Sequence, residues 1–182
     1  KARVYAAAFE GAMDAIEALS KPTICVIKGF CMGGGCEMSM ATDIRIAADN
    51  GKFAIPTAKL SVLVGYKEMR RLSNLVGPGN TSYILLSGRR FDASEAMQMG
   101  LVNKVVPLNE IDDFTYALAR EMVDLAPLSA SGHKKILQTV LSNPSLSGLT
   151  PEEEKLPFSN FASEDFQEGR KAFLEKRQPH FK

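Results

Sequence analysis

One stretch of the chain, TICVIKGFCMGGGCE at residues 23–37, decides the fold. Its first five residues, 23–27, are apolar and partly β-branched, and they are bounded by Pro22 and Gly29. This pattern predicts a buried strand. Residues 38–41, which follow the stretch, are mostly apolar and compatible with a helix. The sequence therefore predicts a strand that turns through glycines into a helix.

The glycine triplet Gly33-Gly34-Gly35 occupies that turn, and Glu37 follows it by two residues. The first N–H groups of a helix have no intrahelical acceptor, and glycine lets a ligand oxygen approach them without a Cβ in the way. An oxyanion site beside a first-turn carboxylate would form two parts of one active site. On the motif alone a second interpretation stays open, in which the glycines only allow tight strand–helix packing and Glu37 is a solvated carboxylate.

Other glycine loops fit this stretch less well. No Lys-Ser or Lys-Thr pair follows the glycines, as a P-loop requires, and their spacing is not G-x-G-x-x-G. Neither Ser nor Cys stands at the centre of a nucleophile elbow.

The composition favours one globular domain without a nucleic-acid or membrane partner. The 182 residues suffice for a substantial core, and 22 basic and 21 acidic residues give a net charge of +1. No apolar run approaches the ~20 residues of a membrane span, and we see no signal peptide. Three clustered cysteines favour reduced thiols in a cytoplasmic protein, and with only two distant histidines we expect no metal site. These residues are Cys25, Cys31, Cys36, His133 and His180.

Strands that alternate with helices, followed by helices alone, predict a layered α/β core with a helical C-terminal part. Asp92 with Glu95 predicts a capping box and Gly100 a helix stop, while Thr150 and Pro151 predict a helix start. The expected helices cover residues 3–19, 37–41, 67–75, 82–86, 111–125, 129–141 and a segment from 151, and the expected strands cover 23–27, 44–48 and 101–106.

The stretch from Lys21 to Glu37 resembles the signature of the crotonase, or enoyl-CoA hydratase/isomerase, superfamily. Residues 41–48, 86–106 and 161–177 resemble the same family in the same order. The resemblance implies an α/β fold, in which repeated ββα units form a spiral core and C-terminal helices pack subunits into trimers.

The resemblance also implies a division of the chain. Residues 1–107 would form part of the spiral core and residues 108–182 the helical trimerisation subdomain. Family members carry further N-terminal strands before the first helix, so we expect the chain to be the C-terminal two-thirds of such a protein. That N-terminal segment would hold the second donor of the oxyanion hole.

By resemblance, the site binds the thioester of an acyl-CoA. The backbone N–H of Gly34, flanked by Gly33 and Gly35, would donate to the thioester oxygen, and Glu37 would be the catalytic acid/base. Coenzyme A would enter as part of the substrate, and no separate cofactor is expected. Lys176 matches a basic position that reaches the CoA of a neighbouring subunit in a trimer or a dimer of trimers, although it could equally be a solvated lysine.

The sequence departs from the family at the second catalytic position. Thr57 stands where hydratases carry a second glutamate, and a hydroxyl cannot replace a carboxylate as acid/base. Gly65 survives from a family glycine motif, and the adjacent Tyr66 would reach the acyl pocket or simply pack. Glu68 is either a relocated acid/base group or an exposed first-turn glutamate, and first turns favour acidic residues. The predicted function is an acyl-CoA enzyme of this family; the alternative is a non-catalytic acyl-CoA-binding protein.

Overall fold

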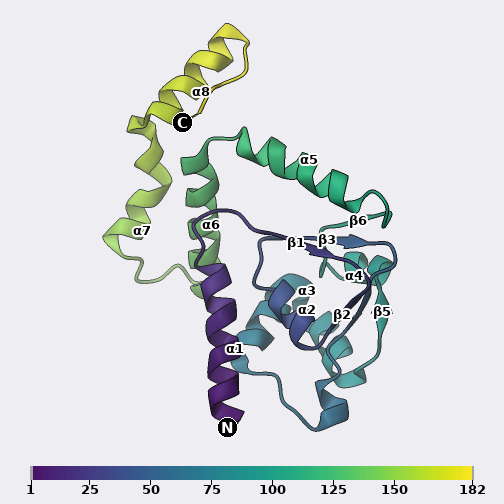
Figure 1. The fold of residues 1–182 in the computed structure, drawn as a ribbon. Coiled ribbons are helices and arrows are strands. Elements are labelled where there is room, and N and C mark those ends of the chain that lie inside the picture. The colour runs from purple at the N-terminus through teal and green to yellow at the C-terminus, as the bar shows by residue number, and fades with distance from the viewer. Residues whose placement is uncertain (1, 182) are drawn as a thin grey trace. The chain divides into compact units, whose positions relative to one another are not determined.

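Figure 1 shows the fold of the chain in a computed structural model, which describes residues 2–181. Contacts divide it into two compact units. The first unit comprises the chain up to Leu19 together with Thr23–Tyr116, and the second comprises Ser20–Pro22 together with the chain from Ala117 onward. The domain boundary predicted after residue 107 stays a prediction.

A parallel sheet forms around the first predicted strand. Its members are β1 (Ile24–Ile27), β3 (Ile44–Ala48) and β6 (Lys104–Val106). Their order is β1-β3-β6, so the central strand β3 pairs on both sides. This explains why four of its five residues are buried. Strand β6 begins three residues later than the predicted strand. Leu101 and Val102 are apolar and buried, but they precede the strand and do not belong to it.

A second sheet lies in the same unit and consists of very short strands. Its members are β2 (Phe30–Met32), β4 (Lys52–Ala54) and β5 (Phe91–Asp92). The order is β2-β4-β5, with β2 parallel and β5 antiparallel to β4. The sequence analysis did not predict β2 or β5, because two or three residues are too few to show a period of two.

Two consecutive strand pairs, each followed by a helix, give the first unit its repeat. Strands β1 and β2 lead into α2 (Gly34–Ser39), and β3 and β4 lead through η1 (Thr57–Leu60) into α3 (Tyr66–Ser87). Each pair contributes one strand to each sheet, as the implied ββα units require. The helix predicted at residues 37–41 begins earlier than expected, because Gly34 and Gly35 already belong to it.

The two helices predicted on either side of residues 76–80 are confirmed as two helical segments of α3. They meet at a kink at Gly77, whose φ of 73° and ψ of 167° are non-helical. Pro78 then starts the second segment, where its missing N–H costs no hydrogen bond. The hydroxyl of Thr81 donates to the Gly77 carbonyl at 2.8 Å and satisfies one backbone acceptor at the kink.

The predicted capping box at Asp92 and the predicted helix start at Thr150 are both confirmed, and the start at Thr150 is also a capping box. At the start of α4 (Ala93–Gln98) the N–H of Glu95 donates to Asp92 Oδ1 at 2.9 Å. At the start of α7 (Pro151–Lys155) the Glu153 N–H donates to Thr150 Oγ1 at 3.2 Å. The helix stop at Gly100 is confirmed by its positive φ of 85°.

The remaining described helices follow the prediction with one difference. The helix expected from residue 151 is short, and it continues as a 3-10 turn before a separate helix capped by Ser163. The elements are α1 (Ala2–Glu17), α5 (Ile111–Val123), α6 (Pro127–Ser142), η2 (Leu156–Ala162) and α8 (Glu164–Glu175).

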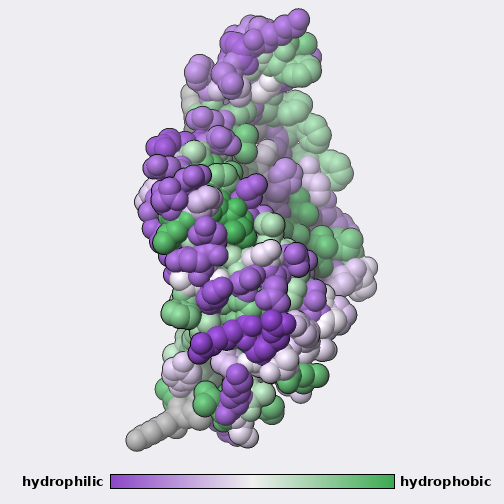
Figure 2. Space-filling view, turned by 90° about the vertical axis from the view of Figure 1, so that its right-hand side faces the viewer, coloured by the Kyte–Doolittle hydropathy of each residue, from purple (hydrophilic) through white to green (hydrophobic). Residues whose placement is uncertain are grey.

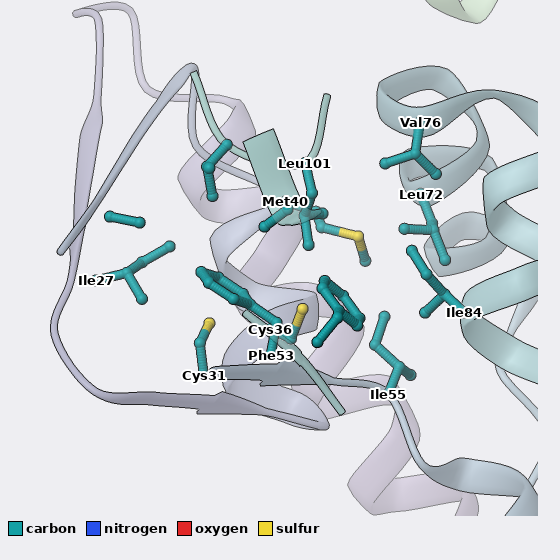
Figure 3. Close-up of a cluster of buried hydrophobic side chains, with 14 of the residues drawn as sticks. Ile27, Cys31, Cys36, Met40, Phe53, Ile55, Leu72, Val76, Ile84 and Leu101 are labelled. Carbon is teal, nitrogen blue, oxygen red and sulfur yellow. The ribbon is translucent and has the colours of Figure 1, made fainter. Parts of the chain in front are cut away.

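One face of α2 packs into the core of the first unit. Cys36 and Met40, one helical turn apart, point into a cluster that Phe53, Leu72 and Ile84 also enter (Figure 3). Successive residues of a helix lie about 100° apart around its axis. The residue after Cys36 is therefore directed away from the centre of this cluster.

The surface drawn in Figure 2 intersperses hydrophilic and hydrophobic residues, in line with the balanced charge. Within residues 2–181, none of the helices combines the length and the apolar character that a membrane span needs. The three cysteines are free thiols, as predicted. The described side chains include no cluster of three or more His, Cys, Asp or Glu residues suited to a metal ion.

Candidate active site

Glu37 lies in the first turn of α2, as the sequence predicts. Its side chain is half-buried and makes no hydrogen bond or ion pair with any other described residue. Burial raises the pKa of this carboxyl, and the negative charge of Glu68 raises it further. An unpaired, partly desolvated carboxyl with a raised pKa has the properties of a general acid/base.

The glycine turn in front of Glu37 has the expected shape. Gly33 adopts a φ of 50°, its N–H donates to the Ala54 carbonyl at 2.8 Å, and its carbonyl accepts from the Glu37 N–H at 2.9 Å. No side chain caps the helix start. Within residues 2–181 the backbone N–H groups of Gly34 and Gly35 therefore have no hydrogen-bond acceptor.

The ring of Phe9 in α1 packs beside Gly34. Two of its ring carbons lie 3.5 Å from the point where a Cβ on Gly34 would stand, and its ring stacks on Tyr5 with centroids 6.1 Å apart. The sequence analysis did not single out Phe9. Its contact with Gly34 joins positions 25 residues apart, which helical periodicity alone does not predict.

Thr57 begins η1 and faces a cavity of about 580 Å³. The residue is half-buried, and most of the side chains around it are aliphatic. The cavity is within the size range of small-molecule sites. Its lining residues are Thr57, Ala58, Ser61, Val62, Leu63, Val64, Met69, Thr81, Ser82, Leu85 and Leu86.

Gly65 is the N-cap of α3, and Tyr66 is its first helical residue. The Tyr66 side chain is 97% exposed, so it does not pack against the described chain. Glu68, at the third helical position, folds back over the N-cap, and its carboxylate occupies the space that a Cβ on Gly65 would need. Glu68 is half-buried, so it is not the exposed first-turn glutamate that was one of the two interpretations of the sequence.

The basic side chains of Lys67 and Arg71 form ion pairs with α1 rather than with Glu68. Lys67 Nζ lies 2.8 Å from Asp14 Oδ2, and Arg71 Nε donates to Glu17 Oε1 at 2.7 Å. These ion pairs hold the first turns of α3 against α1. They leave Glu68 without an ion pair among the described residues and with its charge acting on Glu37.

Lys176 belongs to the second compact unit. It follows α8 in a left-handed conformation, with a φ of 53°, and its side chain is exposed. Its contact with CoA stays a prediction. The structure thus brings together Gly33, Gly34, Gly35 and Glu37 on one turn, with the charge of Glu68 acting on Glu37. Thr57 lies on the cavity that Met69 also lines.

Comparison with known proteins gives the family of the chain. The family model described as enoyl-CoA hydratase/isomerase matches residues 1–182. The chain belongs to the enoyl-CoA hydratase/isomerase family. A crotonyl-CoA hydratase of Syntrophomonas wolfei is 35% identical over 100% of this chain and 69% of its own length. A carnitinyl-CoA dehydratase of Citrobacter koseri is 37% identical over 90% of this chain and 64% of its own.

A solved structure shows the same family fold. An enoyl-CoA hydratase/carnitine racemase from Magnetospirillum magneticum superposes with a TM-score of 0.93 at 35% identity, over 100% of this chain and 67% of that one. The crotonase-like α/β fold of the chain is therefore confirmed. The chain spans 64% of the length of the Citrobacter koseri relative and 69% of the length of the Syntrophomonas wolfei relative.

Proposed function

We propose that the protein is an acyl-CoA enzyme that stabilises a thioester enolate and uses Glu37 to move a proton at C2. The observation that carries the proposal is the state of Glu37, which is half-buried, unpaired among the described residues and raised in pKa by burial. The proposed substrate class is an acyl-CoA thioester, because the related proteins are named for crotonyl-CoA and carnitinyl-CoA.

The oxyanion is assigned to the turn before Glu37. We assign the Gly34 N–H as one donor to the thioester oxygen, with Gly33 and Gly35 giving the backbone the close approach that this contact needs. A donor of this kind contributes about 3 kcal/mol of transition-state stabilisation. When the C2 proton moves to Glu37, the electron pair delocalises onto the thioester oxygen, where the donor stabilises it.

The aliphatic cavity beside Thr57 is proposed to hold the acyl chain. Its volume of about 580 Å³ and its lining of Val62, Leu63, Val64 and Leu85 suit an alkyl chain rather than a polar group. Coenzyme A enters as part of the substrate, and no separate cofactor is required by this chemistry. Gly65 and Tyr66 at the α3 start remain proposed substrate contacts.

Assembly into trimers or dimers of trimers is part of the same proposal. The C-terminal unit exposes Phe158, Phe161, Phe173 and Leu174, each by 60% or more. Aromatic side chains at such exposure favour burial against another subunit. Lys176, at the end of α8, is proposed to pair with a phosphate of CoA.

The alternative is an acyl-CoA-binding protein without catalysis, which the threonine at position 57 favours. Two measurements on the full-length protein separate the readings: exchange of the C2 protons of butyryl-CoA with deuterated water, and equilibrium binding of CoA. Binding with exchange supports the enzyme. Binding without exchange or turnover of any enoyl-CoA supports the alternative, and absence of binding contradicts both.

A further inference from the structure

A second carboxylate stands near Glu37, although position 57 carries none. We propose that Glu68 is the second catalytic carboxylate of the site and that it holds and deprotonates the water added to a 2-enoyl-CoA. This inference rests on the proposed function, because it assigns the water-activating step at the same site.

The first support is the position of the Glu68 side chain. It folds back over the N-cap Gly65, into space that is free only because residue 65 has no Cβ. Any larger residue at position 65 would displace the carboxylate. The next residue, Met69, lines the same cavity as Thr57, so the first turn of α3 and the start of η1 border one cavity.

The second support is the arrangement of the surrounding charges. Lys67 directly precedes Glu68 and Arg71 follows it by about one helical turn, yet both pair with acidic residues of α1. Among the described residues, Glu68 forms no ion pair, and its carboxylate oxygens accept no hydrogen bond. Its oxygens are therefore available to accept a proton from water.

The third support is the interaction between the two glutamates. Burial and the charge of Glu68 both raise the pKa of Glu37 and so favour its protonated form. Hydration needs one group that accepts a proton and one that donates it. Thr57 can supply neither role at neutral pH.

The step balances as the addition of water. The water oxygen forms a bond to C3 while its proton passes to Glu68, and the π electrons of the C2–C3 double bond move toward the thioester as an enolate. Protonated Glu37 then gives its proton to C2, and the proton held by Glu68 is returned to Glu37. The product is the 3-hydroxyacyl-CoA, and neither glutamate changes overall.

The test compares two reactions of the full-length protein. Hydration of crotonyl-CoA needs both carboxylates, whereas exchange of the C2 protons of butyryl-CoA needs only one base. Glu68→Gln is expected to lower the kcat of hydration about 100-fold or more while exchange stays within about threefold. Glu37→Gln is expected to abolish both reactions, and the exposed Glu110→Gln serves as a matched control that changes neither.

A second variant protects the test against a folding defect in the first. Thr57→Glu in the Glu68→Gln background returns a carboxylate to the cavity edge and is expected to recover hydration at least tenfold, with thermal unfolding recorded for each variant. Hydration by Glu68→Gln within about twofold of the unmodified protein would overturn the proposal. So would equal losses of hydration and exchange, or exchange without any hydration in the unmodified protein. Loss of both reactions and of CoA binding in the unmodified protein would instead remove the proposed function.

Discussion

Arg71 and Glu17 form a two-point ion pair that ties α3 to α1. Arg71 Nε and Nη2 each donate to a different carboxylate oxygen of Glu17 at 2.7 Å, and Nη2 also reaches Asp14 Oδ1 at 2.7 Å. The Arg71 side chain is only 7% exposed, whereas the two acidic side chains are substantially exposed. The partners raise the pKa of Arg71, which is therefore a permanent cation at this contact.

Replacing Arg71 with Ala should therefore destabilise the first unit. The change removes charge-assisted hydrogen bonds and leaves a gap, but solvent can still reach the abandoned carboxylates. We expect a loss of about 2 kcal/mol in the free energy of unfolding, measured by urea denaturation. Arg71→Lys should recover only part of the loss, because a lysine cannot reproduce the two-point geometry. Equal stability of Arg71→Ala and the unmodified protein would contradict a structural role for this pair.

Glu37→Gln should remove proton transfer without weakening CoA binding. The substitution keeps the size of the side chain and removes the base, so kcat should fall about 100-fold to 10,000-fold. The measurement is the exchange of C2 protons in butyryl-CoA, with calorimetric titration of CoA alongside. An activity within about twofold of the unmodified protein would move the catalytic role to another residue.

The same substitution should increase stability at neutral pH. Since the folded state raises the pKa of Glu37 above its ordinary value of 4.5, the folded state binds more protons than the unfolded state in that range. The contribution of Glu37 to stability thus falls as the pH rises from its unfolded pKa through its folded pKa. Glu37→Gln should raise the Tm at pH 7.5, and the gain should disappear below about pH 4, where both states are protonated. A gain that persists unchanged at low pH would assign the effect to packing.

Thr57→Val should test whether the hydroxyl contributes to catalysis. The Thr57 hydroxyl has no hydrogen-bond partner among the described residues and borders the cavity proposed for the acyl chain. A lost hydrogen bond to water should lower the kcat of hydration about fivefold, well below the effect of removing a carboxylate. Steady-state rates with crotonyl-CoA provide the measurement, and Thr57→Ser should retain the rate. A loss above about 100-fold would give Thr57 an acid/base role that its chemistry does not support.

Phe173→Ser should weaken assembly while the chain stays folded. The Phe173 side chain is 83% exposed in the single chain, so its removal costs little within the chain itself. Light scattering should show trimers or hexamers for the unmodified protein and smaller species for the variant, with unchanged circular dichroism. The matched control is Tyr116→Ser, which removes an exposed aromatic residue of the first unit. A monomeric unmodified protein would contradict the assembly proposal.

Local sequence patterns determined the elements whose causes are local. The strand at residues 24–27 is an apolar run between a proline and a glycine, and both capping boxes depend on residues three positions apart, Asp92 with Glu95 and Thr150 with Glu153. The stretch from Lys21 to Glu37, followed in order by residues 41–48, 86–106 and 161–177, was also enough to indicate the family. Glu37 could be singled out because its carboxylate follows the glycine turn directly in the chain.

Only the tertiary structure decided which distant residues meet. Strand β5 exists because Phe91 pairs with Phe53 across the second sheet, and a two-residue strand has no pattern of its own. Likewise, Glu68 acts on Glu37 because the cations beside it are drawn to α1 and because Gly65 leaves room for its carboxylate. Such contacts depend on long-range packing and on competition between charges, and neither is encoded in the spacing of neighbouring residues.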